Sequence, residues 1–292
     1  MCHIVFKRTQ TNQSSQPDEN SLGWIIDAHK NLPGLEQLYK RFPKAKWFML
    51  IDDDTYVIKH NLKALLNRFD SRKLYYFGLA TRFIGCGTIT KWGDGPLFAH
   101  GGSGIVISRG AMIKLLPRLP GCIMKHRGCR FGDVKVALCL EEAGILLHFT
   151  GGFNKDPPNA QSSYMDGPCE LPITFHHLLP HQIQELYQFE QGIIQSWKKT
   201  TDPFVTMADV FRRFASFDQN RYEMNTDRKG KDIARVETRN AHSCKDECNR
   251  TQDCTSFVFA DQSCWLKSGI PPSSNATGYV SGVIPEHYTC SL

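Results

Sequence analysis

The sequence has no long apolar run. Residues 1 to 7 hold no apolar stretch long enough for a signal peptide or an anchor, and no later segment is long enough to span a bilayer. Lys and Arg form no long block interleaved with aromatic residues, so the formal charge of +6 gives little support for a nucleic-acid role. With 41% hydrophobic and 22% charged residues, the composition is that of a globular protein.

Cysteine, by contrast, is abundant. The chain holds eleven, and five crowd its last fifth: Cys244, Cys248, Cys254, Cys264 and Cys290. Close spacing in a small, loop-rich segment is typical of disulfides formed in an oxidising compartment. Three glycosylation acceptor patterns, at Asn12, Asn249 and Asn275, agree with that compartment, although short patterns also arise by chance. The cysteines therefore indicate a secretory route that the visible amino terminus does not encode.

Three consecutive carboxylates, Asp52, Asp53 and Asp54, end the apolar run Trp47 to Ile51. The run reads as a buried strand, so the carboxylates are expected where that strand leaves the core. Adjacent anions repel one another unless a cation offsets the repulsion, and oxygen ligands suit Mg²⁺ or Mn²⁺. The alternative is an acidic turn on the surface, because Asp is a common turn former.

Helical and strand patterns alternate through the first two thirds of the chain. Helices are expected after Pro33, around residues 62 to 69 and 112 to 116, and over 133 to 143 with Gly144 as the stop. Strands are expected at 47 to 51, 74 to 77, 104 to 108 and 145 to 149. Ser108 is the expected cap of the helix after it. This alternation predicts a layered α/β domain with a mostly parallel sheet.

The domain organisation follows from these patterns and from the cysteines. Residues 1 to 21 form a flexible amino-terminal segment, with 9 to 21 rich in polar residues, and the α/β domain spans 22 to 200. Residues 201 to 232 are expected to be a helical region and a linker, and 233 to 292 a cysteine-rich module.

Two further segments of the α/β domain carry residues suited to a site. The Gly101 to Gly104 segment lets the backbone approach a ligand closely, or is simply a tight turn into a strand; it is no P-loop, because neither Lys-Ser nor Lys-Thr follows. Asp133 begins a helix, where it is either an N-cap or a general base that faces a cleft.

Histidine and cysteine offer other candidate ligands. His176 and His177 could complete a carboxylate metal site, although such a pair is more often structural or on the surface. Cys122, His126 and Cys129 fit no tetrahedral zinc spacing well, so disulfides are preferred there.

Taken in order, Trp47 to Val57, Gly101 to Gly104, Gly132 to Val134, and Phe175-His176 resemble one family. It is the fringe-like and core 1 β1,3-galactosyltransferase group of glycosyltransferase family 31, particularly its fungal members, and the match covers roughly residues 22 to 195. The resemblance implies a GT-A fold and inverting transfer of a sugar from a UDP-sugar to an acceptor hydroxyl, with Mn²⁺, or Mg²⁺, bound. Galactose in β1,3 linkage onto N-acetylgalactosamine of a glycoprotein is the group's common theme, and fringe members transfer N-acetylglucosamine to fucose.

The resemblance also implies roles, carried over by position. Asp54 would bind the metal directly, Asp52 would assist, and His176 would be the other protein ligand, with His177 as the choice if the register slips by one. Asp53 would face the nucleotide sugar. The turn at Gly101 and Gly102 would border the donor or acceptor, and Asp133 would be the base. The family is anchored in the Golgi membrane.

The tail resembles an apple or PAN module. Its short helix would be the segment from Ser243 to Cys248, and its hairpin the segment from Cys254 to Lys267. The resemblance implies two bridges, Cys244 to Cys264 and Cys248 to Cys254. Such modules bind proteins or carbohydrates, so this one is expected to hold an acceptor glycoprotein.

The family also has early strands that shape the nucleotide pocket, and here little precedes the acidic strand. We therefore expect a domain shortened at its amino terminus, with those strands absent. The alternative function is a catalytically impaired, secreted binding protein whose PAN-like module recognises protein or glycan. A metal-dependent hydrolase ranks lower, because the sequence offers no dense set of further acidic or His ligands.

Overall fold

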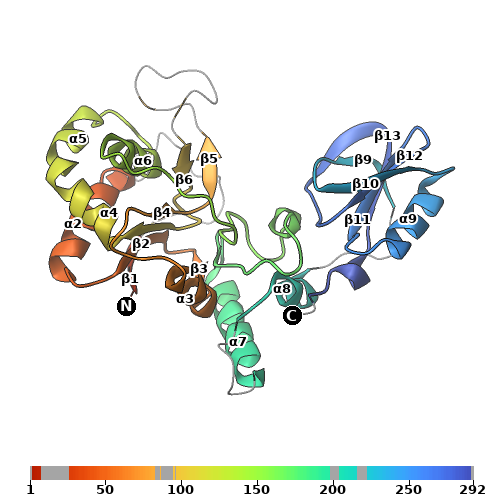
Figure 1. The fold of residues 1–292 in the computed structure, drawn as a ribbon, viewed down its shortest axis with the longest axis horizontal. Coiled ribbons are helices and arrows are strands. Elements are labelled where there is room, and N and C mark those ends of the chain that lie inside the picture. The colour runs from red at the N-terminus through yellow and green to blue at the C-terminus, as the bar shows by residue number, and fades with distance from the viewer. Residues whose placement is uncertain are drawn as a thin grey trace. The chain divides into compact units, whose positions relative to one another are not determined.

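The computed structural model describes residues 2–7 by their backbone, and residues 26–82, 86, 95, 97–197, 204–215 and 222–290. The chain forms two compact units (Figure 1). The first consists of residues 1–155 and 173–192, and the second of residues 156–172 and 193–292. The second unit is thus assembled from two separate stretches of chain. Of the segment expected to be flexible, residues 1 to 21, Cys2–Lys7 form a strand instead, and residues 8 to 21 lie outside the described residues.

A four-stranded sheet lies at the centre of the first unit, in the order β1-β2-β7-β4. Its strands are β1 (Cys2–Lys7), β2 (Trp47–Asp52), β7 (Ile105–Ser108) and β4 (Tyr76–Phe77). β1 runs parallel to β2, so a strand does precede the acidic one, contrary to the expectation from sequence. The expected mostly parallel sheet is also wrong, because β7 inserts between β2 and β4 and runs antiparallel to both.

Both faces of this sheet are covered. Along β2, Phe48 and Leu50 join the core cluster on one face with Leu35 of α2 and Met112 of α4, while Trp47, Met49 and Ile51 join the cluster on the other face with Leu62 of α3. A strand buried on both faces has no polar alternation, which explains the continuous apolar run. Each such buried side chain stabilises the fold by roughly 1.5–3 kcal/mol.

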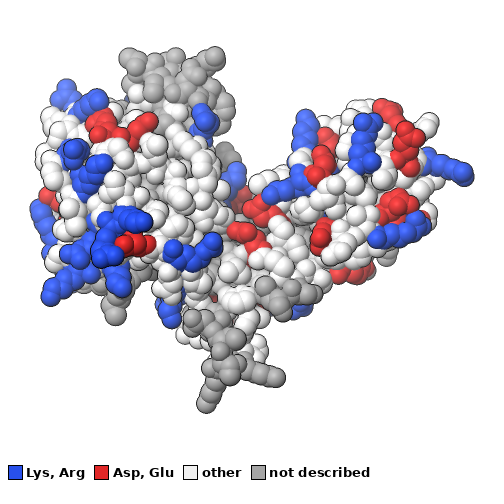
Figure 2. All heavy atoms as spheres, viewed as in Figure 1, with Lys and Arg blue, Asp and Glu red and all other residues white. Residues whose placement is uncertain are grey.

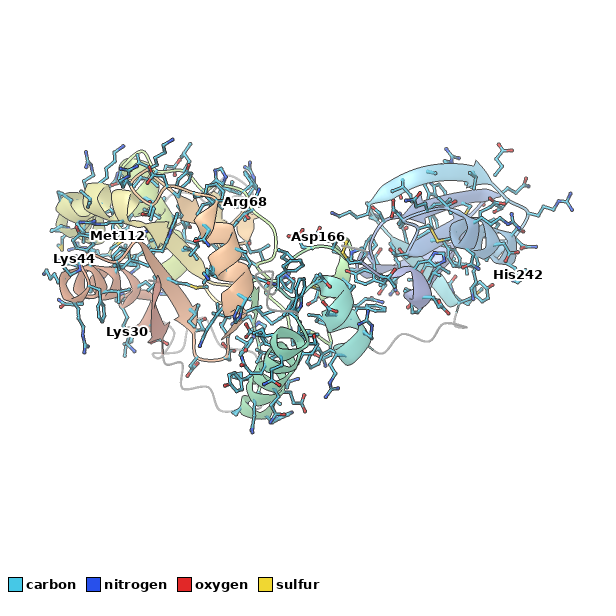
Figure 3. The ribbon with its side chains drawn as sticks, turned by 60° about the horizontal axis from the view of Figure 1, so that its bottom comes forward. Lys30, Lys44, Arg68, Met112, Asp166 and His242 are labelled. Carbon is cyan, nitrogen blue, oxygen red and sulfur yellow. A yellow bond between two sulfur atoms is a disulfide. The ribbon has the colours of Figure 1, made fainter. Side chains whose placement is uncertain are left out.

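The described helices of the first unit are α2 (Asn31–Arg41), α3 (Lys59–Asn67), α4 (Arg109–Leu115), α5 (Leu119–Lys125), α6 (Gly132–Glu142) and α7 (Pro180–Ser196), the last of which ends in the second unit. Apolar spacing in the sequence predicted α2, α3, α4 and α6, but neither α5 nor α7. The 3₁₀ turn η1 (Leu116–Arg118) joins α4 to α5. Figure 3 labels Lys30 and Lys44, which flank α2, and Arg68, which caps α3. No described helix is both long and apolar enough to cross a membrane.

Two predicted helix boundaries are confirmed and one predicted strand is wrong. Ser108 caps α4 by accepting a hydrogen bond from the Ala111 amide, and Gly144 follows α6 with a φ of +68°. The segment 145 to 149 is not a strand. Ile145 and Leu147 are buried there while Leu146 is 71% exposed, and the segment reaches the sheet through the His148 amide, which donates to the Tyr76 carbonyl.

Two short antiparallel pairs lie beside the main sheet. β3 (Tyr56–Val57) pairs with β8 (Thr174–Phe175), and β5 (Ala80–Arg82) pairs with β6 (Leu97–Ala99). The β3–β8 pair joins two segments that lie more than a hundred residues apart in sequence, and it determines where the candidate site forms.

The second unit contains a five-stranded antiparallel sheet in the order β10-β12-β11-β13-β9. Its strands are β9 (Glu223–Arg228), β10 (Asp232–Glu237), β11 (Ser256–Ala260), β12 (Ser263–Lys267) and β13 (Ser273–Val283); its helices are α8 (Met207–Phe214), α9 (Ala241–Arg250) and the 3₁₀ turns η2 (Gln161–Tyr164) and η3 (Pro285–His287). The segment expected to be a linker therefore contributes the strand β9, whose Arg228 is fully buried and donates to Glu223 at 2.6 Å.

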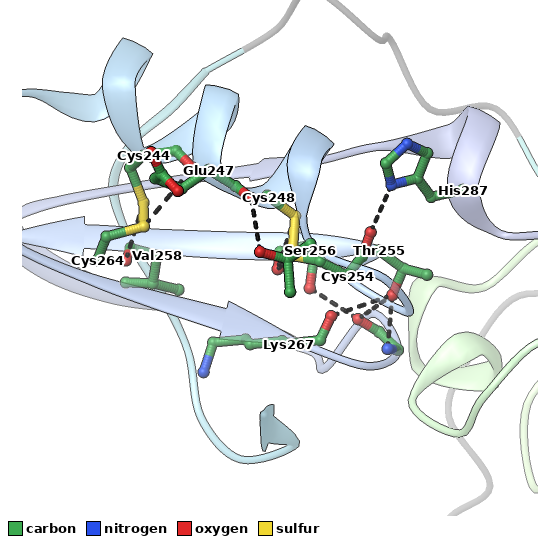
Figure 4. The surroundings of a disulfide bond; sticks show 12 residues. Cys244, Glu247, Cys248, Cys254, Thr255, Ser256, Val258, Cys264, Lys267 and His287 are labelled. Carbon is green, nitrogen blue, oxygen red and sulfur yellow. Dashed lines mark hydrogen bonds between the residues drawn. A yellow bond between two sulfur atoms is a disulfide. The ribbon is translucent and has the colours of Figure 1, made fainter. Parts of the chain in front are cut away.

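Disulfides hold this unit together. Cys244 pairs with Cys264 and Cys248 with Cys254, as the resemblance to a PAN module implies (Figure 4). The first bridge joins α9 to β12, and the second joins α9 to the segment just before β11. A third bridge, Cys169 to Cys290, ties the inserted stretch 156–172 to the carboxyl end. In the first unit, Cys122 pairs with Cys139 and Cys86 with Cys129, so these cysteines are not available as zinc ligands.

Candidate metal centre

The acidic triplet lies where β2 leaves the sheet. Asp52 ends the strand, and the Thr55 amide donates to the Asp52 carbonyl at 3.3 Å, which closes a turn through Asp53 and Asp54. The chain then enters β3, which pairs with β8. Because His176 and His177 follow β8, the pairing brings them to the turn, and the Leu178 amide donates to the Asp54 carbonyl at 3.1 Å.

Four of the expected residues meet here. His176 Nε2 lies 3.2 Å from Asp54 Oδ1 and 3.9 Å from Asp52 Oδ2, and His177 Nδ1 lies 3.8 Å from Asp54 Oδ2. Ligand atoms of Asp54, His176 and His177 all fall within 4.8 Å of one another. Asp54 is therefore the shared centre, Asp52 is beside it, and Asp53 is exposed on the turn.

The orientation of the His176 ring suits a ligand. His176 is buried, and its Nδ1 lies 3.1 Å from the Lys155 carbonyl, which can only accept a hydrogen bond. Nδ1 therefore carries a hydrogen, and in the neutral ring Nε2 presents a lone pair toward Asp54. A carbonyl that fixes the ring in this way is the usual support of a metal-binding histidine.

The electrostatics also call for a cation. Although burial lowers the pKa of His176, its hydrogen bond and attraction to Asp54, with Asp52 adding to them, raise that pKa above the ordinary value. Burial raises the pKa of Asp54, but the neighbouring His176 and His177 outweigh it and hold that pKa well below the usual range. Asp54 and His176 thus each favour the charged form of the other.

The residues present fit a metal ion. Asp54 Oδ1 is buried and accepts no well-aligned hydrogen bond within the described part of the chain, although His176 Nε2 lies near it. Carboxylate oxygens combined with imidazole nitrogens suit a borderline ion such as Mn²⁺. Asp54, His176 and either His177 or Asp52 would hold it.

The predicted glycine turn packs against this cluster. A Cβ atom built on Gly102 would fall 2.2 Å from the His176 ring, so only glycine fits there. The Thr55 hydroxyl donates to the Gly102 carbonyl at 2.7 Å, which ties the turn to the acidic segment. Gly104, with a φ of +95°, leads into β7. The close approach expected for these glycines is thus made to His176.

Asp133 lies on the other side of the same turn. It occupies the first turn of α6 but is not the N-cap, which is Phe131. Its Oδ2 accepts a hydrogen bond from the Gly101 amide at 2.9 Å, and the side chain is half-buried. Its Oδ1 accepts a second hydrogen bond, from the Val134 amide of the same helix at 2.9 Å, so both oxygens of the carboxylate are held in place.

Sequence reasoning missed three contributors. Thr55 and Lys155 support the turn and the His176 ring through single hydrogen bonds. His100 lies with its ring 5.7 Å from that of His176, and burial lowers its pKa to about 4. Of these three, His100 and Thr55 could have been found from sequence, because His100 directly precedes the glycine pair and Thr55 directly follows the acidic triplet.

Figure 2 shows the distribution of charged side chains on one face of the molecule. Lys and Arg side chains occur on both units and are interspersed with Asp and Glu (Figure 2). This distribution agrees with the sequence, in which basic residues form no long block.

Comparison with known proteins identifies the class. A profile of the Fringe-like family matches residues 7–153, about half of the chain, and a PAN domain profile matches residues 226–267. The chain belongs to the Fringe-like family. It is a member of glycosyltransferase family 31 with a C-terminal PAN domain, and it is distantly homologous to core 1 β1,3-galactosyltransferase.

Curated relatives with low sequence identity to this chain are named as sugar transferases. Glycoprotein-N-acetylgalactosamine 3-beta-galactosyltransferase 1 of Xenopus laevis is 27% identical over 173 residues, covering 50% of this chain and 45% of the relative. Human chondroitin sulfate glucuronyltransferase is 37% identical over 76 residues (26% and 9%), and human beta-1,3-glucosyltransferase 28% over 134 residues (46% and 25%). The chain thus spans less than half of each of these relatives.

A solved glycosyltransferase involved in the glycosylation of the major capsid of PBCV-1 also matches. It shows a TM-score of 0.35 and 14% identity over 60% of this chain and 81% of that one. This similarity is too low to support an argument.

Proposed function

We propose that the chain is a metal-dependent inverting glycosyltransferase of GT-A type, which transfers a sugar from a UDP-sugar to an acceptor hydroxyl. The observation that carries the proposal is the convergence of Asp54 and His176 at the end of β2, where Asp54 Oδ1 is buried without a well-aligned hydrogen bond. Family membership supplies the reaction class. Within it we propose galactose, β1,3-linked to N-acetylgalactosamine of a glycoprotein, because one relative is named for that activity.

Each site residue then has a role. Asp54 and His176 would hold Mn²⁺, with His177 or Asp52 assisting, and the ion would supply positive charge for the diphosphate leaving group. Asp53, exposed on the turn, faces the nucleotide sugar. The Gly101 and Gly102 turn borders the donor or acceptor.

Asp133 acts on the acceptor. Its carboxylate takes the proton from the acceptor hydroxyl as the oxygen attacks the anomeric carbon and the bond to UDP breaks. Hydrogen bonds from the Gly101 amide to Oδ2 and from the Val134 amide to Oδ1 fix the carboxylate, and a second lone pair on either oxygen can receive the proton. Inversion follows from attack opposite the leaving group.

Binding of UDP and Mn²⁺ separates this proposal from a catalytically impaired binding protein. Isothermal titration of the full chain should show UDP binding that depends on Mn²⁺. A panel of UDP-galactose, UDP-glucose, UDP-glucuronic acid and UDP-N-acetylglucosamine, offered with N-acetylgalactosaminyl and fucosyl acceptors, should then show which sugar is transferred. Absence of both UDP and Mn²⁺ binding would leave the binding-protein function.

We further propose that the PAN domain recognises the acceptor glycoprotein, on the secretory route and at the Golgi membrane typical of the family. Three side chains of the sheet support this proposal. The rings of Trp265 and Tyr279 lie 6.3 Å apart between centroids and 16° from parallel, and the exposed Arg235 lies over Trp265. Aromatic faces suit sugar rings. Trp265→Ala should lower activity on glycoprotein acceptors and leave activity on small acceptors unchanged. Met124→Ala, at an exposed residue of α5, should change neither activity.

A further inference from the structure

A buried carboxylate in the first unit has two partners from another part of the chain. Glu190 of α7 is 2% exposed. The Tyr56 hydroxyl donates to its Oε2, and His60 Nδ1 lies 3.1 Å from its Oε1. Both carboxylate oxygens are therefore engaged, one by β3 and the other by α3.

These contacts join the same two segments that form the metal centre. Tyr56 comes two residues after Asp54, and α7 begins three residues after His177. The β3–β8 pair that brings the segments together has two residues in each strand, which is marginal by itself. Backbone hydrogen bonds from Leu178 to Asp54 and from Ile58 to Ile173 extend this pair, and Glu190 adds a side-chain attachment between the segments.

Burying a carboxylate costs more free energy than burying an apolar side chain at the same position. Removing one partner of a buried hydrogen-bonded charge leaves a buried polar group without compensation and destabilises the fold. An apolar residue would serve for packing alone. The carboxylate instead fixes the direction of the Tyr56 ring, and hence the course of the chain that leaves Asp54.

We propose that Glu190 is a positioning residue for the metal centre, acting through Tyr56 to set the approach of Asp54 to His176. The inference rests on the proposed function only in taking this centre as the metal site. Partners that orient metal ligands typically change metal affinity by about 10–100-fold.

The test measures Mn²⁺ affinity of the full-length chain without donor, by electron paramagnetic resonance. Glu190→Gln and Tyr56→Phe should each weaken Mn²⁺ binding by about 10–100-fold. The double variant should be little worse than either single one, because both remove the same contact. Asp209→Asn, which breaks a capping box in the second unit, is the control: it should lower stability without changing Mn²⁺ affinity.

A second readout keeps the two proposals apart. The ring resonances of His176 in the metal-free chain should shift in Glu190→Gln and stay unchanged in Asp209→Asn. Wild-type Mn²⁺ affinity and unshifted His176 resonances in folded Glu190→Gln and Tyr56→Phe would overturn the positioning role alone. A wild-type chain that binds no Mn²⁺ would overturn the metal site, and the His176 resonances would then decide the positioning role.

A separate observation concerns the two glycosylation patterns in the described residues. Asn249 lies in the last turn of α9, and the Thr251 hydroxyl that completes its pattern donates to the Glu247 carbonyl at 2.8 Å. Asn275 and Thr277 are both exposed on β13, where pairing with β9 is interrupted between Asn275 and Val280. A bulky glycan needs such a surface position.

We infer that Asn275 carries an N-linked glycan and Asn249 does not. The five disulfides, which form in the same oxidising compartment, support this independently of any enzymatic role. The chain, secreted from a eukaryotic host behind a cleavable leader, is treated with peptide N-glycosidase F and mapped by peptide mass spectrometry.

Deamidation at position 275, lost in Asn275→Gln and retained in Asn249→Gln, is the expected result. An unmodified peptide containing Asn275, or a glycan on Asn249, would overturn the inference. Peptide mapping also separates these sites from Asn12, which lies outside the described residues.

Discussion

Gly102 lies with its backbone against the imidazole of His176, so closely that a Cβ atom would fall 2.2 Å from ring atoms Cε1 and Nε2. Gly102→Ala must therefore displace the ring or the turn. We expect loss of Mn²⁺-dependent activity and weaker Mn²⁺ binding, measured by titration. Gly121→Ala in α5 is the control, because a Cβ atom added there would have nothing within 4 Å of it. Normal Mn²⁺ affinity in Gly102→Ala would show that the ring is not held by this contact.

Asp54 is the shared carboxylate of the cluster, so Asp54→Asn removes a charge and nearly no volume. We expect it to abolish Mn²⁺-dependent activity, since the amide binds hard cations poorly. Asp70→Asn, which breaks a surface ion pair with Arg72, should leave activity unchanged. Activity assays across Mn²⁺ concentrations make the comparison. An unchanged Mn²⁺ requirement in Asp54→Asn would remove this residue from the site.

Asp133→Asn tests the proposed base. The amide oxygen can still accept the Gly101 hydrogen bond that holds the turn, whereas the acceptor for the Val134 amide and the base for proton transfer are lost. Turnover should fall by about 10²–10⁴ and UDP and Mn²⁺ binding should change little. Steady-state kinetics and titration measure the two effects separately. Wild-type turnover would rule out Asp133 as the base.

The raised pKa of His176 predicts how metal binding depends on pH. A proton and Mn²⁺ compete for Nε2, so affinity should fall about tenfold per pH unit as the pH drops below that pKa. Without metal the sign reverses. The protonated ring stabilises the fold fully below its unfolded pKa, and that stability is lost as the pH rises through the higher folded pKa.

Comparing wild type with His176→Gln isolates this group from His29 and His100, whose pKa values are lowered. Calorimetric titration gives the affinity, and thermal melts give the metal-free stability. A Mn²⁺ affinity that stays constant on acidification would contradict the ligand role of His176.

The Cys169–Cys290 bridge closes a loop with a sequence separation of 121, whereas Cys248 and Cys254 are only 6 apart. Loop-closure entropy predicts that removing the long bridge destabilises the second unit by about 5 kcal/mol and removing the short one by about 2 kcal/mol. Denaturant unfolding of the paired Cys→Ser variants tests this. Equal losses of unfolding free energy in the two variants would contradict the view that the bridges act by restricting the unfolded chain.

Local patterns predicted much of the fold, because they depend on neighbouring residues. The buried strand at Trp47, the Ser108 cap and the Gly144 stop each follow from side-chain chemistry within a few residues. The direction of β7 and the recruitment of β9 do not, since strand partners are chosen over long separations.

The same division holds for the site. Asp54, Asp133 and His176 were singled out from sequence, and the structure brings them to the two sides of one glycine turn. The supports of His176 could not be found in this way. The Lys155 carbonyl is backbone, which leaves no mark in a sequence, and Glu190 is far from its partners along the chain.

His177 adopts a φ of +58°, a left-handed backbone that glycine or asparagine occupies at lower cost. Judged by backbone strain alone, His177 is therefore the first residue that a redesign for thermal stability would replace. Such a replacement would gain stability and lose an imidazole that lies 3.8 Å from Asp54. A thermally stabilised variant should accordingly keep residues 176 and 177 unchanged and carry its substitutions elsewhere.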